Sequence, residues 1–236
     1  MTAKLLLLAV ALTTGVASAQ VLNPEDVLTR MEQRSARQNE QLQWTQHLRS
    51  YEAENTRIHK KGELLARVRF DAPDRKAITV INRNGSGSIQ GRVFDPLIKA
   101  EKESADPKVR ATTEICRRNY EFTFERFDDA ESAYVFRMVP RTENRYLVRG
   151  EIWVDAHEFA VRRIEGEPAQ KPSFWVRKTH FVHEYRKFGD YWFPVSNRTE
   201  VELKLLGNSK LTIQYKNYEW EGKATTPAGV ETVASF

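Results

Sequence analysis

Cysteine is almost absent from this 236-residue sequence: Cys116 is the only one, so no disulfide can form within the chain. The simplest interpretation of Cys116 is a small, half-buried side chain, because a cysteine nucleophile needs a histidine positioned beside it. A serine elbow, a phosphate-binding loop and a dinucleotide fingerprint are also missing. Asn84-Gly85-Ser86-Gly87 has glycines without the lysine or the strand-to-helix frame of such loops. We therefore predict no catalytic residue and no cofactor.

Runs of charge of one sign are missing too. The chain has 37 Lys and Arg against 32 Asp and Glu, a net charge of +5, and short basic pairs such as Arg117-Arg118 stand among acids. Nucleic-acid-binding domains gather basic residues on one face, so we expect no nucleic-acid partner. A weak attraction to anionic lipid surfaces stays open.

Long hydrophobic runs are limited to one place, near the N-terminus. Lys4 precedes the apolar run Leu5–Leu12, and small residues ending in Ala17-Ser18-Ala19 follow. This order predicts a signal peptide at 1–19 with cleavage before Gln20. The run is far shorter than the roughly 20 residues of a membrane-spanning helix. No cysteine near the cleavage site offers a thiol for a lipid, so we expect a soluble periplasmic protein.

Helices are predicted at two places. The first begins after Asn23, a suitable N-cap, with Pro24 in the first helical position. Its apolar stripe is thin, so we expect one edge to cover something while the rest faces water. The stripe consists of Val27, Leu28, Met31 and Leu42. A second short helix is expected from about Pro96 to near Asp106.

Strand patterns fill most of the remaining chain. Apolar and polar residues alternate from Trp44 onward, and a proline-containing turn at 71–75 joins two segments as a hairpin. Further alternating segments follow without helices between them, at 120–127, 133–140, 145–155, 160–167, 173–188, 191–207 and 209–221. Such neighbours pair antiparallel, and a sheet of about nine to eleven strands curls. We predict a mainly β (α+β) fold, with a single domain at 20–222 and a flexible polar tail at 223–236.

Two groups of polar residues invite a chemical interpretation. Asp155, His157 and Glu158 fall close together, but they separate two alternating segments, and Asp is favoured in turns because its side chain bonds nearby backbone amides. His180 and His183 are three apart, which would suit a metal on a helix. In a strand they point to opposite faces, so we predict a turn and a strand without a metal site.

Apolar strand faces are easier to find in this sequence than catalytic or metal-binding motifs. Phe122 and Phe124 share one side of their strand, as do Phe136 and Met138 on theirs. In a curled sheet such a side becomes the concave face. It either packs as a filled core under the helices, the commoner outcome for barrels of modest size, or leaves a ligand cavity.

The segment GEIWVDAHEFAVRRIEGEP at 150–168, continued as far as Trp220, resembles the exported outer-membrane lipoprotein-sorting (LolA-like) proteins. A Gly-x-Ile-Trp-Val-Asp strand and turn, an Arg-Ile strand, a Phe-Trp strand and a Trp-Phe-Pro strand occur there in the same order. The resemblance covers most of the mature chain, is best from Tyr120 onward, and is nearest to an uncharacterised branch. It consists of strand patterns, so it identifies no catalytic residue.

This resemblance implies a half-open antiparallel β-barrel whose concave face is covered by the two helices and accepts acyl chains. It makes the cavity the favoured interpretation. The residues predicted to line it by alternation are Phe122, Phe124, Phe136, Met138, Ile152, Val154, Leu203 and Ile213.

Two classes of function follow. The favoured one is a monomeric periplasmic carrier or sensor of an acylated lipid or lipoprotein, with an inner- or outer-membrane transporter component as a possible partner. The alternative is a periplasmic hydrolase on a curled β-sheet scaffold. Bound lipid in the purified protein would favour the first, and turnover lost on changing His157, His180 or His183 would favour the second.

Overall fold

The computed structural model describes residues 22–170, 174, 176–223 and 229–231. The predicted signal peptide and the predicted tail, apart from residues 223 and 229–231, lie outside the described residues. In the part of the chain that is described, no helix is long and apolar enough to cross a membrane.

Helices form a small share of the fold. They are α1 (Pro24–Gln41), α2 (Gly87–Ile89), the π-helical turn η1 (Gln90–Phe94), α3 (Asp95–Glu103) and α4 (Pro107–Thr113). The strands before and after the second helical run are β1 (Leu42–Asn55), β2 (Lys60–Asp71), β3 (Arg75–Gly85), β4 (Tyr120–Asp128), β5 (Ala133–Pro140) and β6 (Val148–Asp155). The remaining strands are β7 (Val161–Pro168), β8 (Val176–Phe188), β9 (Tyr191–Leu203), β10 (Gly207–Gly222) and β11 (Gly229–Glu231).

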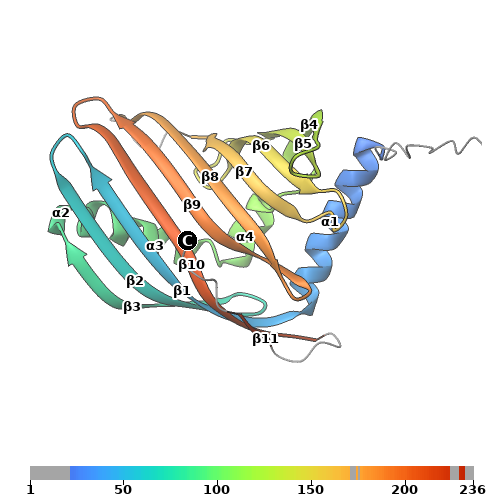
Figure 1. The fold of residues 1–236 in the computed structure, drawn as a ribbon, viewed down its shortest axis with the longest axis horizontal. Helices are drawn as coiled ribbons and strands as arrows, with labels where there is room; N and C mark the ends of the chain where they lie inside the picture. The colour runs from blue at the N-terminus through green and yellow to red at the C-terminus, as the bar shows by residue number, and fades with distance from the viewer. Residues whose placement is uncertain (1–21, 171–173, 175, 224–228, 232–236) are drawn as a thin grey trace, which may run out of the picture.

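The strands form one antiparallel sheet in the order β3-β2-β1-β10-β9-β8-β7-β6-β5-β4, with β11 paired to β10. Two meanders, β1–β3 and β4–β10, meet where β1 pairs with β10, for example with Tyr51 opposite Ile213. Within the described ranges the end strands β3 and β4 do not pair with each other, so the curled sheet stays half open (Figure 1). The predicted mainly β, half-open antiparallel fold is confirmed.

The N-terminal helix forms where its capping pattern predicts. The Asn23 side chain accepts a hydrogen bond from the Glu25 backbone N–H at 3.0 Å, which satisfies one of the free donors of the first turn. Val27, Leu28 and Met31 are buried as the predicted stripe. Leu42, predicted as part of that stripe, is instead the first residue of β1, because the helix ends at Gln41.

The second helical run is longer than predicted. It begins at Gly87 and not near Pro96, and a separate helix, α4, follows Asp106, whose side chain caps it. Gly87 and Gly91 lower the helix propensity of this segment. Packing overrides that propensity, because Ile89 and Phe94 are buried against the sheet.

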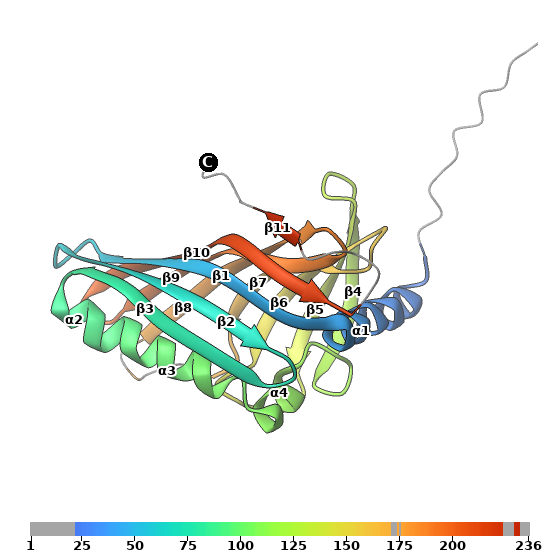
Figure 2. The ribbon, with the colours of Figure 1, turned by 90° about the horizontal axis from the view of Figure 1, so that it is seen from below.

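The helices cover one face of the sheet and divide its core in two. Figure 2 shows α2, α3 and α4 running along the side of the sheet that β1–β3 form, while α1 lies at the other end. Phe94 and Ile98 join the first core cluster with residues of β1, β2, β9 and β10. Val27, Leu28 and Met31 of α1 join the second with residues of β4–β7. The two halves of the concave face are therefore closed by different helices.

Candidate functional site

A cavity of about 560 Å³ lies between α1, α4 and strands β7–β9. This volume is within the roughly 300–1,000 Å³ that small-molecule sites occupy. The lining comes from α1 (Met31, Arg34, Ser35, Gln38 and Asn39), from the β2–β3 turn (Pro73), from α4 and its flanks (Pro107, Arg110, Ala111, Thr113, Glu114 and Ile115), from the residue before β7 (Ala160) and from the sheet (Val161, Tyr185 and Trp192).

The apolar wall of the cavity continues the second core cluster. Met31 is a buried member of that cluster and also lines the cavity. Ile115, Val161 and Tyr185 are partly buried, pack against the same cluster and also line the cavity. An apolar ligand in the cavity would therefore extend the protein's own core, which is a favourable way to remove its surface from water.

Two arginine side chains, those of Arg34 and Arg110, line the cavity. Arg34 of α1 donates to the backbone oxygen of Asp190, and Arg110 of α4 donates to the backbone oxygen of Pro73. Arg110 has no carboxylate within ion-pair distance among the described residues, although Glu114 also lines the cavity. Arginine carries five N–H donors in a planar fork that suits carboxylates and phosphates. One backbone contact leaves most of the donors of Arg110 available to such a group.

The side chain of Gln38 forms hydrogen bonds that connect α1 to the start of β9. It accepts from the Trp192 backbone N–H at 2.9 Å and donates to the Trp192 carbonyl at 3.0 Å. The indole Nε1 of Trp192 is buried and has no hydrogen-bond partner among the described residues. Since buried donors are nearly always satisfied, this N–H is a donor that a ligand group could use.

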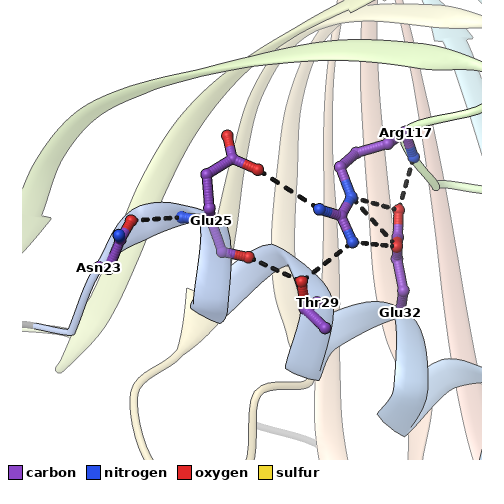
Figure 3. Close-up of polar contacts among 5 residues, drawn as sticks. All are labelled: Asn23, Glu25, Thr29, Glu32 and Arg117. Carbon is purple, nitrogen blue, oxygen red and sulfur yellow. Dashed lines mark hydrogen bonds and ion pairs between the residues drawn. The ribbon is translucent and has the colours of Figure 1, made fainter.

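A second attachment holds the first half of α1 (Figure 3). The backbone N–H and the guanidinium of Arg117 both donate to Glu32, at 2.6 Å and 2.7 Å, and the guanidinium also reaches Thr29 at 3.0 Å and Glu25 at 3.3 Å. Burial alone would raise the pKa of Glu32, but the hydrogen bonds and charge of Arg117 lower it. The helix is thus fixed to the segment before β4 as well as to β9.

The other half of the concave face contains a buried ionic cluster. Glu101 of α3 lies 3.2 Å from the Arg49 guanidinium of β1 and also pairs with Lys76 of β3. Arg49 is only 4% exposed. Burial alone would raise the pKa of Glu101, but the two cations lower it to about 2. The carboxylate therefore stays charged and ties α3 to two strands of the sheet.

Aromatic side chains and histidines surround Arg49. Its guanidinium lies 4.6 Å from the Tyr215 ring centroid and 3.3 Å from both the Tyr51 hydroxyl and His47 Nε2. Burial, reinforced by Arg49, lowers the pKa of His47 to about 2 and that of His183 to about 4. Both imidazoles are neutral near pH 7, and with pKa values this low they are weak bases.

The structure distributes the eight predicted lining residues over several places. Phe136, Met138, Ile152 and Val154 are buried together in the second core cluster, with Phe122 packed at its margin. Phe124 is 36% exposed on the end strand β4, Ile213 belongs to the first cluster, and Leu203 is half-buried at the end of β9. None of the eight is among the residues that line the cavity, and their contact with a ligand stays a prediction.

Most of the residues that line the cavity were missed because they lie on the polar face of α1 and in or beside α4. Arg34, Ser35 and Gln38 belong to the part of α1 that we expected to face water. The only available signal was their spacing, since Met31, Arg34, Ser35 and Gln38 follow the i, i+3, i+4, i+7 pattern of one helix face.

Asp155, His157 and Glu158 lie in a turn after β6, as predicted. The Asp155 carboxylate accepts from the backbone N–H groups of His157, at 3.0 Å, and Glu158, at 2.7 Å. His180 and His183 lie on β8, where the first is half-buried and 3.2 Å from Glu165, and the second packs against Tyr215. Among the described residues, no group of three or more His, Cys, Asp or Glu is placed to hold a metal.

Comparison with known proteins gives similarities of fold at low sequence identity. No family model matches the chain, and no curated protein matches it. A domain assigned to the outer membrane lipoprotein-sorting proteins, from Vibrio parahaemolyticus, is 10% identical over 84% of this chain and 93% of its own, with a TM-score of 0.45. A DUF1329 family protein from Desulfovibrio piger is 13% identical over 83% and 90%, with a TM-score of 0.42. A LolA superfamily protein from Nitrosomonas europaea is 12% identical over 88% and 96%, with a TM-score of 0.39. The family that the strand patterns resemble is thus among the structures to which this chain is similar.

Proposed function

We propose that this protein is an exported periplasmic binding protein that holds an acyl chain of a lipid or lipoprotein and acts as a carrier or sensor in the envelope. One observation carries the proposal: the cavity between α1 and α4 extends the apolar core and has two arginines in its lining. This combination suits a ligand with an apolar chain and an anionic or strongly polar head.

In this proposal the chain lies against Met31, Ile115 and Val161, and the head lies near Arg34 and Arg110. The predicted lining residues Phe136, Met138, Ile152 and Val154 form the deeper part of the site. They become accessible when α1 moves away from the sheet, because its Val27, Leu28 and Met31 cover them. A membrane transporter component is the proposed source or recipient of the ligand.

We propose a role without catalysis. The buried histidines, His47 and His183, are held neutral, and His157 lies in a turn with no described partner group for acid–base chemistry. A hydrolase would need a nucleophile with an adjacent base. No observation on the described residues favours that arrangement.

The test is displacement of a fluorescent fatty acid from the mature protein by unlabelled lipid. Ser35 lines the cavity, whereas its neighbour Ala36 is exposed on the same helix, so Ser35→Phe and Ala36→Phe form a matched pair. We expect Ser35→Phe to weaken probe binding by about tenfold, equivalent to about 1.4 kcal/mol, and Ala36→Phe to leave it unchanged. Absence of probe binding by the wild type, or equal affinities for the two variants, would refute the proposal.

A further inference from the structure

Two neighbouring hairpin tips form an exposed end of the sheet. The β1–β2 turn at 56–59 and the β9–β10 turn at 204–206 lie side by side, because β1 pairs with β10 as far as Asn55 opposite Ser209. Figures 1 and 2 place these tips at the end of the molecule away from α1. We call residues 55–62 and 203–212 the paired tips.

The paired tips are held together by specific contacts. Asn55, only 6% exposed, donates to the Leu206 carbonyl at 2.9 Å and to the Ser209 hydroxyl at 2.8 Å, and it accepts from the Ile58 backbone N–H at 3.1 Å. The stem of Arg57 packs over Gly207, where an added Cβ would lie 3.2 Å from the arginine Cδ. Their exposed side chains are therefore presented on a fixed scaffold.

Large apolar side chains project from both turns. Ile58 is 40% exposed, Leu205 65% and Leu206 42%. Next to them, the Lys204 Nζ lies 3.4 Å from the ring centroid of Phe174, which is 77% exposed. Exposed leucines are ordinary when single, but a group of them at one end of a protein marks a place of interaction.

The charge of the paired tips has one sign. They contain Arg57, Lys60, Lys61, Lys204 and Lys210 and no Asp or Glu. Lys61 pairs with Glu63 at 3.0 Å and Lys210 with Glu200 at 3.6 Å. Among the described residues no carboxylate pairs with the other three cations. Carboxylates resume directly beyond the tips, at Glu54, Glu63 and Glu202, so the cations without a carboxylate partner are those nearest the turns.

We propose that the paired tips dock this protein onto a membrane surface that contains anionic lipid. Apolar side chains that enter the interface beside cations that contact lipid headgroups are the combination by which peripheral proteins bind such surfaces. A protein partner is a poorer fit, because a stable interface buries about 800 Å² on each side, and two turns present only a few side chains.

The experiment is flotation of the mature protein with vesicles of equimolar phosphatidylglycerol and phosphatidylcholine, compared with phosphatidylcholine alone. We expect binding to the mixed vesicles, weakened by added salt. Leu205→Ser together with Leu206→Ser should weaken it by about tenfold or more, and replacing Lys60 and Lys204 by Ser should weaken it by about fivefold per charge. Ile81→Ser together with Val139→Ser removes two other exposed apolar side chains, 47% and 44% exposed, and serves as a control that keeps binding.

The outcomes separate this inference from the proposed function. The paired tips do not line the cavity, so the tip variants should bind the fluorescent fatty acid as tightly as the wild type does and unfold at the same temperature. Equal binding to both vesicle types, no binding to either, or equal losses in the tip and control variants would overturn the inference. So would flotation that requires an added envelope protein.

Discussion

Replacing Glu101 by Gln tests whether the buried ionic cluster holds α3 on the sheet. The change keeps the shape of the side chain but leaves Arg49, 4% exposed, and Lys76 without their shared anion. Removing one partner from a buried ion pair costs roughly 3–5 kcal/mol, because the remaining charge is desolvated and unpaired. The pKa of Glu101 gives a similar magnitude: lowering it from 4.5 to about 2 corresponds to about 3 kcal/mol at 1.36 kcal/mol per unit.

The pH dependence has a definite sign. Because the folded-state pKa of Glu101 is depressed, its stabilisation is fully present above the unfolded value of 4.5 and is lost as pH falls towards 2. The difference in unfolding free energy between the wild type and Glu101→Gln should therefore be largest near neutral pH and shrink below about pH 4.5.

Urea unfolding at neutral and acidic pH measures this difference, and Glu103→Gln is the matched control. Glu103 lies on the same helix and pairs at 2.8 Å with Arg145, but that arginine side chain is 67% exposed, so the pair should contribute no more than about 1 kcal/mol. If the two variants lose the same stability at neutral pH, the cluster is not what fixes α3 and the reasoning fails.

Three further predictions concern the core, the turn and the histidines. Val154→Phe should destabilise by about 1–3 kcal/mol in equilibrium unfolding, because Val154 is completely buried in the second core cluster, and a variant as stable as the wild type would show space there. His157→Ala should change stability by no more than about 0.5 kcal/mol in thermal unfolding, since the Asp155 carboxylate holds the turn. A larger loss would mean that the imidazole itself stabilises the fold. The free energy of unfolding should fall as pH drops below about 6.5, because His47 stays neutral in the folded state, with its pKa at about 2, and binds a proton when unfolded. His47→Phe should reduce that slope in urea titrations at several pH values, and identical slopes would contradict the assignment.

Local patterns were sufficient to predict most of the elements. Asn23 and Pro24 mark the start of α1 because capping depends on adjacent residues, and the segment 133–140 forms β5 with the predicted bounds because polar turn residues stand on both sides of it. The pairing of β1 with β10 was not predicted, since it joins segments more than a hundred residues apart and no short pattern encodes it.

The buried polar residues show why the site was harder to predict than the fold. Arg49 alternates with Tyr51 and Ala53 on the covered face of β1, so its burial is readable from periodicity. Its partner Glu101 lies on a helix far along the chain, and only the tertiary structure shows that the charge is compensated. The cavity depends in the same way on how α4 approaches α1, which the polar composition of both helices conceals.

The two helix attachments differ in strength, and this difference indicates where the proposed acyl ligand would enter. On one half of the concave face, α3 is fixed by an ion cluster whose disruption costs roughly 3–5 kcal/mol, in addition to the buried Ile98. On the other half, α1 buries three apolar side chains, and its Arg117 attachment is with a side chain that is 39% exposed and therefore screened by water. The two hydrogen bonds of Gln38 to the Trp192 backbone join uncharged groups, which contribute about 1 kcal/mol each. An acyl chain that replaces the contacts of Val27, Leu28 and Met31 restores the apolar burial that the helix loses, so the exchange is nearly neutral in hydrophobic energy. No comparable exchange is open to α3, because an acyl chain supplies no anion to Arg49. We therefore expect ligand entry to move α1 and to leave α3 in place, which hydrogen exchange with and without fatty acid would detect as lost protection confined to α1.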